Sequence, residues 1–63
     1  MTHLKQATRS KISEQLGGAD FVLVSMRDFE WDGEKRTRYT VRRPKGQKLY
    51  HLIGFANGSI VLC

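Results

Sequence analysis

The alternation of apolar and polar residues divides the chain into one helical segment and four extended ones. In the first segment, apolar or small residues recur at spacings of three and four, which places them on one face of a helix. They are Leu4, Ala7, Thr8, Ile12 and Leu16. Gly17 follows, and a glycine at this point can adopt the left-handed conformation that closes a helix. We therefore expect a helix over about residues 2–17, with Thr2 as its candidate N-cap.

Beyond Gly18 the chain becomes rich in β-branched and aromatic residues, and short turn signals interrupt it. Asp32-Gly33 and Asn57-Gly58 are each typical of a two-residue hairpin turn. Pro44-Lys45-Gly46 marks a further turn between them. The pattern predicts strands over about residues 20–31, 35–43, 48–56 and 59–63. Three short connections in a row favour an antiparallel meander with the helix on one side. The expected fold is a single α+β domain of order αββββ over residues 1–63.

The Asp32-Gly33 turn predicts which residues of the first hairpin share a face, because it places Trp31 opposite Glu34. The expected core face carries Val22, Val24, Met26, Tyr39 and Val41, with a Glu30–Lys35 pair near the turn. The other face interleaves arginines with aromatic residues. It carries Leu23, Ser25, Arg27, Phe29 and Trp31 opposite Arg42, Thr40, Arg38, Arg36 and Glu34. A slip of one residue would exchange the two faces.

The last two extended segments are apolar on both faces. Leu49, Ile53 and Phe55 point one way, whereas Tyr50 and Leu52 point the other. One helix of about 15 residues covers only one side of such a sheet. The second side is then exposed, functional or covered by another chain, and an exposed apolar patch on a small protein marks a contact site. We therefore expect a homodimer or a protein partner as one way of covering it.

Charge is distributed unevenly along the 63 residues, which hold 11 Lys and Arg against 6 Asp and Glu. All six acidic residues lie between positions 14 and 34, and seven of the eleven basic ones lie between 35 and 48. Arginine suits phosphate because its planar fork donates two hydrogen bonds at once. The candidate binding residues are Arg27, Phe29, Trp31, Arg36, Arg38, Arg42, Arg43, Lys45 and Lys48. Phe29 and Trp31 add flat surfaces on which bases can stack.

A less specific interpretation of the same charges is cross-strand ion pairing. Asp28, Glu30 and Glu34 lie one strand away from the first basic residues, and such pairs stabilise a hairpin. They leave Arg42, Arg43 and the two lysines that follow without acidic partners. We therefore expect a small non-enzymatic nucleic-acid-binding protein. The alternative is an inhibitor or adaptor of the phage or mobile-element type, which binds a host protein either through its basic face, on an acidic protein surface, or through its exposed apolar sheet face.

Residues that carry catalytic or metal chemistry are few. The only cysteine is Cys63, and the histidines are His3 and His51. A zinc site needs three or four ligands, so these three distant residues are a poor set. His51 and Cys63 lie on neighbouring predicted strands, but a catalytic thiol usually needs a third, orienting group. Alternating carboxylates from Asp28 to Glu34 could in principle bind a hard cation, although basic residues lie between them. We expect no cofactor, metal or catalytic residue.

The hydropathy of the chain gives an expectation for its location. No apolar run approaches the roughly 20 residues that a spanning helix needs. The first residues also lack the apolar stretch of a secretory signal. We therefore expect no membrane partner and a location in the cytoplasm of a cell or of a host cell.

Overall fold

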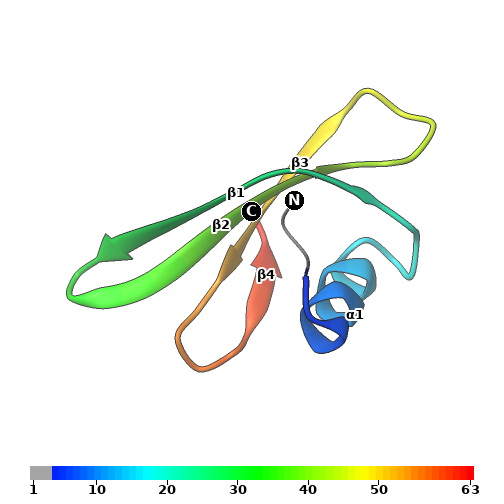
Figure 1. Cartoon of the computed structure of the whole chain (residues 1–63). Coiled ribbons are helices and arrows are strands. Elements are labelled where there is room, and N and C mark those ends of the chain that lie inside the picture. Colours follow the sequence, from blue (N-terminus) through cyan, green and yellow to red (C-terminus); the bar gives the residue numbers. More distant parts are fainter. Residues whose placement is uncertain (1–3) are drawn as a thin grey trace.

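The computed structural model describes residues 4–63, which form one helix and one four-stranded antiparallel sheet (Figure 1). Helix α1 spans Gln6–Gln15, and the strands are β1 (Val22–Trp31), β2 (Glu34–Arg42), β3 (Leu49–Gly54) and β4 (Ile60–Leu62). The strands lie in the sheet in chain order. This arrangement confirms the α+β fold of order αββββ. Thr2 and His3 lie outside the described residues. Within them, no helix is both long and apolar enough to cross a bilayer.

Helix α1 begins later than the apolar pattern predicts and ends where its glycine signal indicates. Its N-cap is Lys5, whose side chain makes no capping hydrogen bond. At the other end, the amide of Gly18 donates to the carbonyl of Ser13 (2.8 Å) and that of Gly17 to Glu14 (3.1 Å). These two bonds, with Gly17 at a φ of 77°, form a Schellman motif. The helix therefore stops sharply, and the chain turns back toward the sheet.

The core lies between α1 and one face of the sheet. It consists of Ile12 and Leu16 from the helix, Phe21 from the connection, and Tyr39, Val41, Leu52 and Ile60 from β2, β3 and β4. Leu4 packs against this core, as predicted, but Ala7 is exposed. The helix lies beside β4, away from the outer part of the β1–β2 hairpin (Figure 1). It therefore covers only part of one sheet face.

A β-bulge changes the predicted core face of β1. Pairing follows the predicted register from Trp31↔Glu34 to Ser25↔Thr40, and then Leu23 pairs with Val41 because Val24 is an extra residue. An extra residue reverses the alternation of all positions beyond it. Leu23 consequently packs on the core, whereas Val22 and Val24 are 37% and 49% exposed. The prediction that these two valines belong to the core is wrong. Met26 keeps its predicted face but is also exposed.

The β3–β4 connection is longer than a two-residue turn. The amide of Phe55 donates to Ser59 O (2.8 Å), and that of Gly58 donates to Phe55 O (3.0 Å). Gly58 has a φ of 93°, whereas Asn57 does not have the positive φ that a type I′ turn needs at both central positions. The extra residue pairs Gly54 with Ile60 and so turns Ile60 into the core. The two-residue prediction for Asn57-Gly58 is wrong.

The β1–β2 hairpin extends past the rest of the sheet. The last pair between β2 and β3 is Thr37↔Gly54, so the tip from 29 to 36 is paired only within the hairpin. Asp32 and Gly33 form the turn with φ values of 52° and 75°, as the sequence predicts for a type I′ turn. The tip projects from the domain (Figure 1).

Candidate functional site on the open face of the sheet

The sheet face turned away from α1 is not covered by any described element. We call it the open face. Strand alternation opposite the buried Tyr39, Val41 and Leu52 assigns its members. They are Val22, Ser25, Arg27, Phe29 and Trp31 of β1, Glu34, Arg36, Arg38, Thr40 and Arg42 of β2, Leu49, His51 and Ile53 of β3, Val61 of β4, and Cys63 beyond it. The open face therefore combines arginines, aromatic rings and aliphatic side chains.

Strand alternation also separates the charges of the hairpin. Asp28 and Glu30 belong to the opposite side of the sheet, where Thr37 donates a hydrogen bond to Asp28 (2.8 Å). On the open face the acidic residue is Glu34, whose carboxylate lies 3.7 Å from the Arg36 guanidinium. Both residues belong to β2, so this ion pair lies within one strand, and among the described residues no salt bridge joins β1 to β2. The remaining positive charge of the open face is not neutralised by this pair.

Arg27 and Arg38 lie directly opposite each other at the centre of the hairpin. Both are exposed, and within the described residues neither forms a salt bridge. They line a hollow of about 380 Å³ together with Phe29, His51, Ile53 and Cys63. Like charges that face each other across two strands are destabilising. The hollow thus combines two positively charged hydrogen-bond donors, Arg27 and Arg38, with the apolar side chains of Phe29 and Ile53.

His51 of β3 lines this hollow, and two hydrogen bonds connect it to neighbouring residues. Its Nδ1 shares a hydrogen bond with Thr40 Oγ1 (3.1 Å), and the Thr40 side chain is buried. The backbone amide of Cys63 donates to the carbonyl of His51 (2.9 Å). Among the described residues, no hydrogen bond links the Cys63 sulfur with the imidazole. The structure thus brings His51 and Cys63 together through a backbone hydrogen bond, while Thr40 holds the His51 imidazole.

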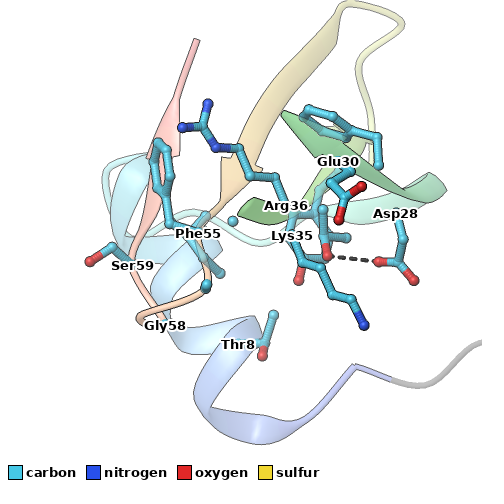
Figure 2. Close-up of a pocket in the computed structure, with 14 residues that line it drawn as sticks. Thr8, Asp28, Glu30, Lys35, Arg36, Phe55, Gly58 and Ser59 are labelled. Atoms are coloured by element: carbon cyan, nitrogen blue, oxygen red, sulfur yellow. Dashed lines mark hydrogen bonds between the residues drawn. The ribbon is translucent and has the colours of Figure 1, made fainter. Parts of the chain in front are cut away.

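The hairpin tip adds an aromatic end to the open face. Trp31 is 62% exposed. Arg36 stacks on the Phe55 ring at 4.9 Å from its centroid, beside a second hollow of about 630 Å³ (Figure 2). Thr8 of α1 and Gly58 of the β3–β4 connection line the other side of that hollow. Its lining mixes Asp28 and Glu30 with Lys35 and Arg36, so it has no dominant charge.

The remaining predicted binding residues lie at the opposite end of β2. Arg42 donates to the carbonyls of Arg43 (3.1 Å) and Pro44 (3.3 Å), and so holds the loop that follows. Arg43 and Lys48 lie over the Tyr50 ring, at 5.8 and 5.5 Å from its centroid. Tyr50 packs against the core side of the sheet. A hydrogen bond from Arg43, with the charges of Arg43 and Lys48, lowers the pKa of Tyr50.

The nine predicted residues therefore do not share one surface. Arg27, Phe29, Trp31, Arg36, Arg38 and Arg42 belong to the open face, whereas Arg43 and Lys48 surround Tyr50 and Lys45 is exposed in the turn. His51 and Ile53 are members of the site that the charge pattern did not predict. Extending the hairpin register across β3 would have found them, because Thr40 pairs with His51 and Arg38 with Ile53.

The described residues contain no group of three or more His, Cys, Asp or Glu side chains that could hold a metal ion. No protein-family model, curated protein or solved structure matches the chain. The function is accordingly inferred from the chemistry of the open face.

Proposed function

We propose that the protein binds nucleic acid through the open face. The observation that carries this proposal is an uncovered sheet face on which arginines lie beside the half-buried Phe29 and the exposed Trp31, with Glu34 as its acidic residue among the described positions. Arginines contribute phosphate contacts that release counterions, which is the sequence-independent part of nucleic-acid affinity. Phe29 and Trp31 contribute rings for base stacking. We further propose that the protein works without catalysis, in the cytoplasm of a cell or of a host cell.

Fluorescence anisotropy with labelled single- and double-stranded DNA and RNA tests this function. We expect micromolar or tighter binding to at least one of the four near physiological salt, with affinity that falls steeply as salt rises. No binding to any of them at low salt would overturn the proposal.

Two triple variants locate the binding surface. R27Q/R36Q/R38Q changes the open face, and R43Q/K45Q/K48Q changes the loop end of β2, so that each removes three positive charges. The logarithm of the binding constant falls linearly with the logarithm of the salt concentration, and each lost phosphate contact reduces the magnitude of this slope by about 0.7–0.9. We expect the open-face variant to lower the slope by about 2 and the loop-end variant by less than half as much. Equal losses would contradict the assignment to the open face.

A second candidate function is binding to a protein, as an inhibitor or adaptor. Exposed apolar side chains on the open face favour it: Leu49 is 48% and Val61 41% exposed, in addition to Trp31. Large exposed aromatic residues are typical centres of protein interfaces. A stoichiometric protein partner that survives nuclease treatment, together with absence of nucleic-acid binding, would support this function instead.

A further inference from the structure

We infer that the ligand of the open face is single-stranded nucleic acid, with one phosphate held between Arg27 and Arg38 and an unstacked base on Phe29 and Ile53. This inference rests on the proposed function and makes it specific. It starts from the arginine pair, which faces across two strands without a salt bridge to any described carboxylate. An anion between the two guanidinium groups removes their repulsion, and phosphate accepts paired hydrogen bonds from each fork.

The apolar lining of the hollow indicates a ligand with an apolar part in addition to a phosphate. Phe29 and Ile53 contribute apolar surface next to the two arginines, and the volume of about 380 Å³ lies within the range of small-molecule sites. A phosphate ion would leave the apolar part of this hollow in contact with water. A nucleobase offers a flat π-face to the Phe29 ring, and such stacking tolerates any base. The two halves of the hollow therefore match the two halves of a nucleotide.

His51 adds a polar group at the edge of the same hollow. Its Nδ1 is occupied by Thr40 Oγ1 at 3.1 Å, so Nε2 is the ring nitrogen left for a ligand. A buried threonine holds the imidazole in place. Fixed polar groups of this kind orient a ligand in a site whose surface is mainly apolar.

The shape of the open face favours a single strand over a duplex. Four strands with roughly 4.8 Å between neighbours are wider than the ~12 Å major groove of B-form DNA. A base in a duplex is also stacked and paired, so it has to leave the helix before it can enter the hollow. The narrow part of the molecule is the two-stranded tip, with Trp31 and Lys35. A duplex would therefore be contacted by the tip, and a single strand by the hollow.

The test compares a labelled single-stranded oligonucleotide with the duplex of the same sequence, both as DNA and as RNA, by anisotropy near physiological salt. We expect at least tenfold tighter binding of the single strand. R27Q/R38Q should weaken single-strand binding at least tenfold, and the matched R43Q/K48Q, which removes the same charge, less than threefold. F29L, which keeps the apolar volume but removes the ring, should weaken it about fivefold or more.

The outcomes separate this inference from the proposed function. Duplex binding that equals or exceeds single-strand binding, and that is lost in W31A but kept in R27Q/R38Q, would overturn the single-strand site and leave nucleic-acid binding intact. Equal weakening by R27Q/R38Q and R43Q/K48Q would also overturn the site. Absence of binding to every nucleic acid at low salt would overturn both. Far-ultraviolet circular dichroism of each variant confirms that it is folded.

Discussion

At the scale of single residues, the pairing of Arg27 with Arg38 should cost stability in the free protein, because like charges that face each other across two strands repel. The two side chains lie opposite each other on exposed positions, without a described acidic partner. We expect R38Q to raise the free energy of unfolding by about 0.2–1 kcal/mol, because it removes one of two like charges. For a domain of this size that is a rise of a few degrees in Tm, measurable by circular dichroism at low salt.

The control for this prediction is K45Q, which removes a positive charge from the exposed turn after β2. It should change Tm less than R38Q does. Added salt should reduce the difference between R38Q and the unchanged protein, because exposed charges are screened over about 10 Å at 0.1 M. A lower Tm in R38Q would mean that the arginine stabilises the sheet through its aliphatic stem, and would contradict a net repulsion between the two guanidinium groups.

The two tyrosines of the sheet respond to pH in opposite directions. Burial and, next, the charge of Asp28 raise the pKa of Tyr39 above its ordinary 10.0, against a hydrogen bond with Thr37 that lowers it. The folded state therefore holds the Tyr39 proton more tightly than the unfolded state does. This contribution to stability is complete below pH 10 and is lost as the pH rises through the folded-state pKa. The lowered pKa of Tyr50 has the reverse effect, since its contribution is present above pH 10 and is lost at lower pH.

Denaturant unfolding of Y39F and Y50F at pH 8 and pH 11 tests this pair. Relative to the unchanged protein, Y39F should gain stability between the two pH values, because it lacks the hydroxyl that ionises unfavourably in the folded state. Y50F should lose relative stability over the same interval. Parallel changes in both variants would contradict the opposite environments of the two rings.

At the scale of secondary structure elements, local signals predicted the ends and turns correctly where a single residue controls the backbone. Gly17 closes α1, and Asp32-Gly33 sets the β1–β2 register. The bulge at Val24 has no such signal, because Val22, Leu23 and Val24 are all apolar and any of them suits a core. Packing of the whole domain selects Leu23. Asn57-Gly58 was misassigned because the dipeptide fits both a type I′ turn and a type I turn followed by a left-handed glycine.

The residues of the candidate site could be predicted from the sequence only where they follow from the register of the β1–β2 hairpin. Alternation from Trp31↔Glu34 correctly groups Arg27, Phe29, Arg36 and Arg38 on one face. The count of basic residues between 35 and 48 also included Arg43 and Lys48, which surround Tyr50 on the core side. Linear charge density does not record on which side of a strand each residue lies. His51 and Ile53 were missed because they have no charge pattern and become part of the site only through β3 pairing.

The hairpin tip should be the least protected part of the sheet. From Phe29 to Arg36 its hydrogen bonds are made only within the hairpin, and Trp31 at its end is exposed. Local opening of such a segment breaks few buried contacts. We expect tip amides to exchange with deuterium at least tenfold faster than those of Tyr39 and Leu52, measured by NMR. A saturating single-stranded oligonucleotide should slow exchange around Arg27 and Arg38 more than at the tip.

At the scale of the whole molecule, the charge of the open face decides whether it can also serve as a dimer interface. A symmetric dimer places the same patch of both copies together. Here that would bring two sets of Arg27, Arg36 and Arg38 into contact, with one Glu34 from each copy to compensate. The apolar Leu49 and Val61 favour such contact, but unpaired charges buried in an interface are costly. The free protein should therefore be a 7.2 kDa monomer at low salt.

Sedimentation velocity at low and high salt, with R27Q/R36Q/R38Q alongside, tests this balance. Removing three charges per copy lowers the repulsion, so the variant should self-associate at concentrations where the unchanged protein does not. High salt should shift the unchanged protein in the same direction, while it weakens nucleic-acid binding. A dimer of the unchanged protein at low salt that the variant fails to form would instead show that the arginines hold two copies together. On the proposed function, the positive charge that attracts a polyanion to the open face is the same charge that should oppose the docking of a second copy there.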